Sequence, residues 1–215
     1  ETSICHDEVA KPRTKSEGIR DARACALWIS TAMATTLAVR QRWFFVVASQ
    51  PYTILEELSG GVEVRHYPAH TLISVDVAAP FQNAGNAGFR PLVSYISGAN
   101  QSRQQIAMTT PVTHLPHSDA SHTISFVLPE GMTLEDAPIP ADASVRVVEK
   151  PDATVATLRW RGGFEERHAR TAEAKLLASI RSAGRETAGE VFYARYDPPM
   201  TPVFLRRNEA LVELA

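Results

Sequence analysis

The chain has 215 residues and a mass of 23.6 kDa, with 22 basic and 24 acidic side chains and a net charge of −2. A hydrophobic content of 44% and a charged content of 21% are typical of a globular protein and exclude wholesale disorder, while the slight negative charge argues against nucleic acid as a partner. No apolar run reaches about 18 residues, the length that predicts a membrane-spanning helix. Both cysteines, Cys5 and Cys25, lie near the start, so no cysteine-based site is expected in the rest of the chain.

Residues 1–49 are predicted to form an N-terminal extension. Residues 1–23 are polar with mixed charge and too poor in apolar side chains to fold alone, so we expect partial disorder there. Residues 26–39 carry no charge and fit either a signal or anchor segment or an ordinary helix. This leaves cytoplasmic location, export and N-terminal anchoring open, and membrane association is expected only through this extension. The folded domain is predicted over residues 50–215.

The first elements of that domain occur twice, 83 residues apart. VEVRHYPAHTLISVDV (62–77) aligns with VRVVEKPDATVATLRW (145–160), so that Val62, Val64 and Pro68 meet Val145, Val147 and Pro151. The alternation of apolar and polar residues is the same in both segments. It predicts one half-buried strand before each proline and one after it. The chain is therefore expected to contain an internal repeat with pseudo-twofold symmetry.

Each repeated strand pair is followed by a helix and two more strands. The apolar spacing predicts helices over 89–97 and 169–183, each ending near a glycine. Pro91 either starts a shorter first helix or kinks a longer one. Further strands are predicted over 106–115, 124–128, 191–194 and 203–214. Two such halves give an α+β domain with a large, mostly antiparallel, twisted sheet or open barrel and one helix per half.

Catalytic signatures are absent from the sequence. It contains no GxSxG, HExxH, Walker A or GxGxxG motif, which favours ligand binding over an enzyme. His114, His117 and His122 have a spacing that resembles a metal site, but the proline, serine and aspartate among them favour solvated loop histidines. His66 shares strand parity with Val62 and Val64 and so continues an apolar face. It is either an iron or metal ligand or a structural histidine bonded to a backbone carbonyl.

Several segments together resemble the SOUL haem-binding protein family. They are YTILEELSGGVEVRHYPAHTL, GFRPLVSYISGAN, QQIAMTTPV and ARYDPPMTPVFLRRNEALVEL, and the resemblance extends from about Tyr52 to Leu214. The resemblance implies a distorted antiparallel β-barrel with two helices that binds haem or another tetrapyrrole reversibly, without a covalent link, in an open apolar groove. Carriage or buffering of the ligand is the role this suggests.

The same resemblance assigns candidate site residues. His66, in EVRHY, matches the histidine that some family members use as an axial iron ligand, whereas other members lack it. The first helix lines the groove in the family, so Phe89 and Val93 are the matching contacts here. The duplicated fold also resembles bacterial effector-binding domains, which implies the alternative of another hydrophobic small molecule as ligand. A domain that binds only a protein partner is the third interpretation.

Overall fold

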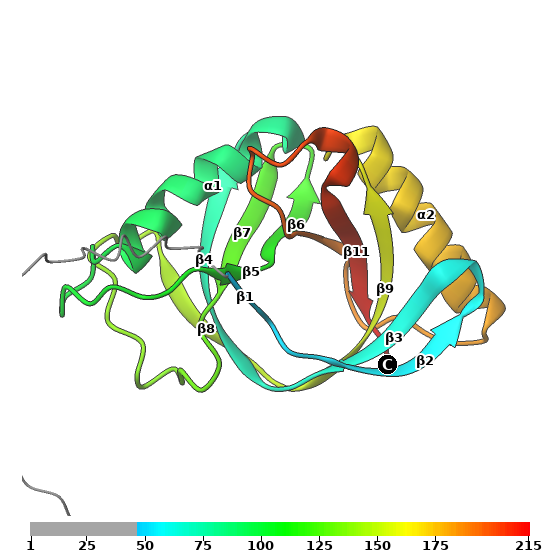
Figure 1. Cartoon of the computed structure of the whole chain (residues 1–215), viewed down its shortest axis with the longest axis horizontal. Helices are drawn as coiled ribbons and strands as arrows, with labels where there is room; N and C mark the ends of the chain where they lie inside the picture. Colours follow the sequence, from blue (N-terminus) through cyan, green and yellow to red (C-terminus); the bar gives the residue numbers. More distant parts are fainter. Residues whose placement is uncertain (1–46) are drawn as a thin grey trace, which may run out of the picture. The chain divides into compact units, whose positions relative to one another are not determined.

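The structure, a computed structural model, describes residues 47–215. The predictions for the N-terminal extension fall almost entirely on residues 1–46 and therefore lie outside the described part. Within residues 47–215, nine strands form one sheet in the order β2-β3-β9-β11-β10-β6-β7-β4-β8, and every pairing in it is antiparallel. The sheet curls into a half-barrel, and the two helices lie on its outer, convex side (Figure 1). The predicted α+β class is confirmed.

The bounds of the elements complete this description. A short parallel pair, β1 and β5, lies apart from the main sheet, and two 3-10 turns, η1 and η2, lie in loops. In chain order the elements are β1 (Ala48–Ser49), β2 (Thr53–Leu58), η1 (Ser59–Gly61), β3 (Val62–Tyr67), β4 (His70–Ala78), α1 (Phe81–Ile96), β5 (Thr109–Thr110), β6 (Val112–Ser118), β7 (Ser121–Val127), β8 (Arg146–Lys150), β9 (Ala153–Arg161), α2 (Glu166–Ser182), β10 (Phe192–Arg195), η2 (Val203–Leu205) and β11 (Arg207–Glu213).

The strand order confirms the internal repeat. From the centre of the sheet outward, β10, β11, β9 and β3 on one side match β6, β7, β4 and β8 on the other. The register obeys the same symmetry: Val64 pairs with Ala156, and the positions 83 residues away from these two, Val147 and Ile73, pair with each other. The first strand of each half thus pairs with a strand of the other half, so the two halves are interlocked in a single sheet.

The observed bounds differ from the predicted ones in three places. Residues 203–205 of the strand predicted over 203–214 form the turn η2, and the strand itself, β11, begins at Arg207. Helix α1 begins at Phe81, eight residues before the predicted start, because Phe81, Ala84 and Gly88 are buried against the sheet and this packing outweighs the low helix propensity of a glycine-rich turn. Pro91 lies inside this longer helix. The strand predicted over 106–115 is interrupted at Pro111, which has no N–H for a ladder, and its main part is β6.

Each helix covers its own part of the convex face. Under α1, a core forms around Leu92, Tyr95, Ile124 and Phe126, and under α2 a second core forms around Leu176. A Cβ atom on Gly88 would lie 2.5 Å from Ile124 Cβ, so only glycine lets α1 approach β7 this closely. Within residues 47–215, no helix lies on the concave face of the half-barrel (Figure 1), so strand side chains form the surface there.

Candidate functional site

One flank of α1 presents apolar side chains beside its buried face. Gly85, Phe89 and Val93 are spaced at i, i+4 and i+8 and therefore lie on the same flank of the helix. Phe89 is 41% exposed although its ring also contacts Phe126, with ring centroids 5.3 Å apart, and Val93 is half-buried against the core. We call Gly85, Phe89 and Val93 the α1 flank.

A second apolar surface lies in the segment between β10 and β11, residues 197–206. Met200, Val203, Phe204 and Leu205 are between 47% and 91% exposed. The segment is held by Arg206, whose guanidinium donates hydrogen bonds to the carbonyl oxygens of Thr201 and Pro199. The exposure of four large apolar side chains in one segment makes this surface a candidate binding region.

Arg195 connects the two surfaces. It is the last residue of β10, two residues before the 197–206 segment begins, and its Nη1 lies 2.9 Å from the position of a Cβ on Gly85. The Gly85 end of the α1 flank therefore faces β10 and the start of the segment. Burial and the charge of Arg206 both lower the pKa of Arg195.

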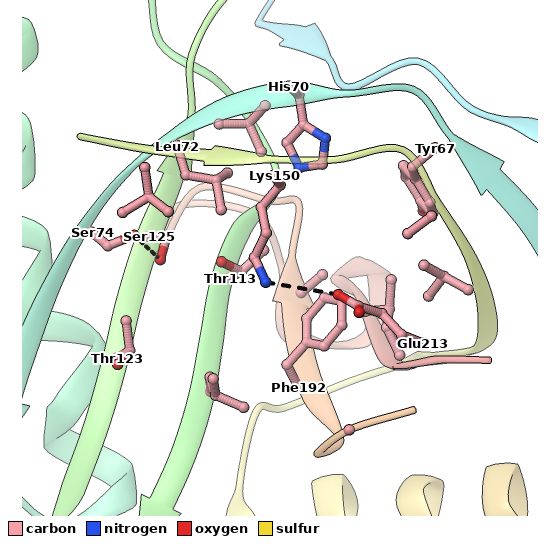
Figure 2. A pocket seen from close by; sticks show the side chains of 18 of the residues that line it. Tyr67, His70, Leu72, Ser74, Thr113, Thr123, Ser125, Lys150, Phe192 and Glu213 are labelled. Atoms are coloured by element: carbon pink, nitrogen blue, oxygen red, sulfur yellow. Dashed lines mark hydrogen bonds and ion pairs between the residues drawn. The ribbon is translucent and has the colours of Figure 1, made fainter. Parts of the chain in front are cut away.

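The concave face holds a cavity of about 380 Å³ (Figure 2). Apolar side chains from seven strands make up much of its wall: Leu72, Leu115, Val127, Val148, Val155, Phe192 and Leu211. Polar groups lie among them, including the hydrogen-bonded hydroxyl groups of Ser74 and Ser125, 2.8 Å apart, and an ion pair of 3.7 Å between Lys150 and Glu213. His70 also lines the cavity, and burial lowers its pKa. This size and mixed lining suit a small organic ligand.

The other half of the concave face is filled by charged and aromatic groups. The guanidinium of Arg65 donates two hydrogen bonds to the Glu209 carboxylate, at 2.9 and 3.1 Å, and both side chains are 0% exposed. Tyr196 donates to the same carboxylate at 2.7 Å, and Arg159 and Arg207 also contact it. Burial by itself raises the pKa of Glu209, but the hydrogen bonds and charge of Arg65 bring it down to about 2. Glu209 is therefore ionised and paired with arginines inside the protein.

The prediction that His114 and His122 are solvated loop residues is wrong. They lie on β6 and β7, each is 1% exposed, and His114 Nε2 is 3.0 Å from His122 Nδ1. Burial, followed by the proximity of His122 and Arg195, lowers the pKa of His114 to about 3. The prediction missed that His122, Ile124 and Phe126 alternate on one face of a strand, which places His122 in the core. His117 is exposed, as expected.

Two further observations bear on the class of site. Within residues 47–215, no group of three or more His, Cys, Asp or Glu side chains is arranged to hold a metal ion. In the same part of the chain, no helix has the length and apolar character needed to cross a membrane.

Comparison with known families decides the classification. A sequence model described as "SOUL heme-binding protein" matches residues 47–213. The chain belongs to the SOUL haem-binding protein family. Among its relatives are heme-binding protein 2 of Homo sapiens, 32% identical over 158 residues that cover 69% of this chain and 75% of the relative, and heme-binding protein 1 of Mus musculus, 27% identical over 184 residues that cover 80% and 95%.

Solved structures share the fold of this SOUL-family chain. The EcmrR C-terminal domain matches with a TM-score of 0.56 at 12% identity, covering 76% of this chain and 98% of that domain. An uncharacterized conserved protein from Listeria innocua matches with a TM-score of 0.52 at 12% identity, covering 72% and 92%. At this identity the likeness concerns the fold alone.

The structure does not bring the three predicted site residues of this SOUL-family chain together. Phe89 and Val93 lie on α1, which packs on β4 and β7, whereas His66 lies half-buried on β3. Five strand intervals separate β3 from β7, which is about 24 Å along the sheet at about 4.8 Å per interval. His66 and the α1 flank are thus two separate candidate positions, and neither lines the concave cavity. Each stays a prediction.

Sequence reasoning did not identify Arg195, the apolar 197–206 segment or the concave cavity. The segment carries a signal in hindsight, since PPMTPVFL places large apolar residues among prolines, where no strand or helix can bury them. The cavity has no local signal, because its wall combines residues from eight strands whose neighbours are fixed only by the sheet order.

Proposed function

We propose that this protein binds haem or another tetrapyrrole reversibly, for carriage or buffering of the ligand, on the apolar surface formed by the α1 flank and the 197–206 segment. The observation that carries the proposal is the exposure of Phe89 and of four large apolar side chains in the segment that follows Arg195, whose guanidinium reaches Gly85 of the same flank. Membership of the SOUL family supports a tetrapyrrole as the ligand, and the human and mouse relatives are named as heme-binding proteins.

Apolar contact alone supplies enough free energy for such binding. Burying about 500 Å² of apolar surface at about 25 cal/mol per Å² contributes about 12 kcal/mol. The loss of translational and rotational freedom costs at least about 4 kcal/mol, which leaves about 8 kcal/mol. That corresponds to a Kd of about 1 μM, an affinity that allows both capture and release. An iron–protein bond is not needed for this affinity.

A haemin titration, followed by the Soret absorbance, tests the proposal. We expect Val93→Asp to weaken haem binding by at least about tenfold, because a bound macrocycle would take the new charge out of water. Leu177→Asp is the matched control: Leu177 is a half-buried apolar residue at the corresponding position of α2, and the same charge there should leave haem affinity unchanged. Equal effects of the two substitutions would contradict the proposed surface, and no haem binding by the wild type at micromolar concentrations would contradict the function.

His66 is kept as the candidate axial ligand and needs its own test. Loss of an Fe–N bond in His66→Ala should shift the Soret maximum and weaken binding modestly. An unchanged spectrum would assign His66 a structural role. Since His66 lies five strand intervals from β7, an iron bond to His66 would also mean that haem binds away from the α1 flank.

The concave cavity supports a second candidate function, the binding of another hydrophobic small molecule. Its volume of about 380 Å³ and its apolar wall favour this alternative. Val148→Trp would fill the cavity from β8. If the cavity is the functional site, this variant should lose binding of small hydrophobic ligands while it keeps haem affinity.

We also infer that the protein acts by binding and not by catalysis, which the names of its relatives support. Turnover of any substrate that depends on His114 or His168 would overturn this inference. Nucleic acid is not proposed as a partner, since the net charge of −2 gives no basic surface in excess.

A further inference from the structure

Arg195 is placed between three elements at one end of the α1 flank. Its guanidinium lies over the ring of Phe164, with the central carbon 5.0 Å from the ring centroid, and its Nη1 lies beside Gly85. The side chain is half-buried. A Cβ on Gly85 would approach Nη1 to 2.9 Å, so the absence of a side chain there leaves room for the guanidinium to lie against the helix.

Among residues 47–215, Arg195 has no acidic partner of the kind that most other arginines in this range have. Within residues 47–215, the Arg195 guanidinium makes no ion pair and donates no hydrogen bond, whereas seven other arginines pair with carboxylates: Arg65, Arg146, Arg159, Arg167, Arg170, Arg185 and Arg207. Two acidic side chains at and before the first half of α2 already have partners. Glu173 accepts hydrogen bonds from Tyr193 and Arg170, and Glu165 pairs with Arg167 and His168.

The charged neighbour of Arg195 is a second cation. The Arg206 guanidinium donates hydrogen bonds to backbone carbonyl oxygens of the 197–206 segment. Burial lowers the pKa of Arg195, and the charge of Arg206 lowers it further. A partly buried guanidinium beside another cation is unfavourable until an anion joins it. A carboxylate suits this position, because the planar guanidinium offers paired N–H donors that match its two oxygens.

The apolar side chains of the α1 flank follow Gly85, the residue that the Arg195 guanidinium contacts. Phe89 lies four residues beyond Gly85 and Val93 four residues beyond Phe89, which is about 6 Å per step along the helix. A ligand that fits the whole arrangement has an apolar body over Phe89 and Val93 and a carboxylate at the edge that faces Gly85. Tetrapyrroles such as haem have this form, with propionate groups on one edge of an apolar ring.

We propose that Arg195 binds a propionate carboxylate of the tetrapyrrole and so fixes the orientation of the ring on the α1 flank. This assignment rests on the proposed function and adds a specificity to it: the site discriminates between porphyrins that carry free carboxylates and those that do not. Arg206 contributes positive potential and holds the segment, and Arg195 makes the direct contact.

The test compares protoporphyrin IX with its dimethyl ester in the same detergent-containing buffer. Both ligands have the same apolar ring, and only the first has ionised carboxylates. We expect the wild type to bind the diacid at least tenfold more tightly than the ester. Arg195→Met should remove this preference by weakening diacid binding about tenfold or more while leaving ester binding unchanged. Arg167→Met, at an exposed arginine on α2, should change neither affinity.

The outcomes separate the two proposals. Arg195→Lys keeps the charge without the paired donors, so it should retain part of the preference for the diacid. It provides the same test if Arg195→Met folds poorly. A wild type that binds acid and ester equally, or a substitution that weakens both alike, would overturn the assignment of Arg195 while the proposed function stands. A wild type that binds neither ligand would overturn both.

Discussion

Helices α1 and α2 occupy equivalent places on the two halves of the sheet, but their inner flanks differ in chemistry. The buried positions Gly88, Leu92 and Ile96 of α1 correspond to Ala172, Leu176 and Ile180 of α2, an offset of 84 residues. The same offset relates Gly85, Phe89 and Val93 to Ala169, Glu173 and Leu177. Where α1 exposes an aromatic ring, α2 therefore has a carboxylate, which accepts a hydrogen bond of 2.6 Å from Tyr193.

The concave face shows a second asymmetry. Arg65 corresponds to Val148 at an offset of 83 residues. Glu209 corresponds to Thr123, because Glu209 pairs with Arg159 on β9 and Thr123 pairs with Asp76, the residue of β4 that matches Arg159. One half thus contains a buried ion pair, and the other half contains a cavity. The duplicated backbone is shared, while side-chain differences place a buried ion pair in one half and leave a cavity over the other half.

The largest effect is expected from breaking the buried ion pair. Glu209→Gln removes the fully buried counter-charge of Arg65, which keeps only its contact with the partly exposed Glu63, so the free energy of unfolding should fall by about 3–5 kcal/mol. Thr123→Val, at the matching position of the open half, should cost less than about 1 kcal/mol. Urea denaturation of both variants measures the difference. Similar losses would mean that the two halves do not differ in this way.

The next effect concerns the close approach of α1 to the sheet. Gly88→Ala improves helix propensity but brings a Cβ within 2.5 Å of Ile124 Cβ, so we expect a net loss of about 1–3 kcal/mol. The reciprocal change on α2, Ala172→Gly, should cost about 1 kcal/mol through helix propensity. Thermal unfolding with calorimetry measures both, and a stabilised Gly88→Ala would show that α1 does not need this contact.

A pH-dependent difference is expected between His114 and its counterpart Tyr193, which pairs with Ala210 as His114 pairs with Ile124. The pKa of His114 is lowered from 6.5 to about 3 in the folded state, so below pH 6.5 only the unfolded chain binds the proton at this site. The free energy of unfolding should therefore decrease as the pH falls, by up to about 1.4 kcal/mol per pH unit.

His114→Phe removes this contribution. Between pH 6.5 and 5, the wild type should lose about 2 kcal/mol more than the variant, because the carboxylates, Glu209 included, titrate alike in both proteins. Denaturation series at these two pH values measure the difference in slope. Parallel slopes would mean that His114 is protonated equally easily in the folded protein.

The smallest effect compares Tyr67 with its repeat counterpart Lys150. Tyr67→Phe loses the hydrogen bond that Arg65 donates to the phenol oxygen at 3.0 Å, which should cost about 1 kcal/mol. Lys150 is half exposed, and its ion pair with Glu213 is screened by water, so Lys150→Met should cost less than about 0.5 kcal/mol. Equal losses would indicate that Lys150, which lines the cavity, contributes as much to stability as Tyr67, which contacts the buried ion pair.

Most of the fold could be predicted from the sequence because its signals are local and occur twice. The 83-residue offset predicted β4 and β9 together, and their bounds, His70–Ala78 and Ala153–Arg161, differ by that number at both ends. The early start of α1 could not be predicted, because it depends on Gly88 packing against Ile124 of a later strand. Local propensity contains no information about that contact.

The candidate site was less accessible to sequence reasoning. Phe89 and Val93 were identified through family resemblance, while Arg195 became a candidate only when its lack of an acidic partner could be examined in three dimensions. The burial of His114 was missed because Pro116, Ser118 and Asp119 indicate a loop by composition, whereas the hairpin of β6 and β7 continues through the first two of these residues.

The central claim is that the tetrapyrrole binds on the convex side, at the α1 flank, and not in the concave cavity. An amide proton–nitrogen chemical-shift map, recorded while diamagnetic protoporphyrin IX is added, tests this most directly. The account predicts that the largest shifts occur at Gly85, Phe89, Val93 and residues 200–206. Shifts concentrated at Leu72, Val148 and the other cavity-lining residues, with the α1 flank unchanged, would contradict it.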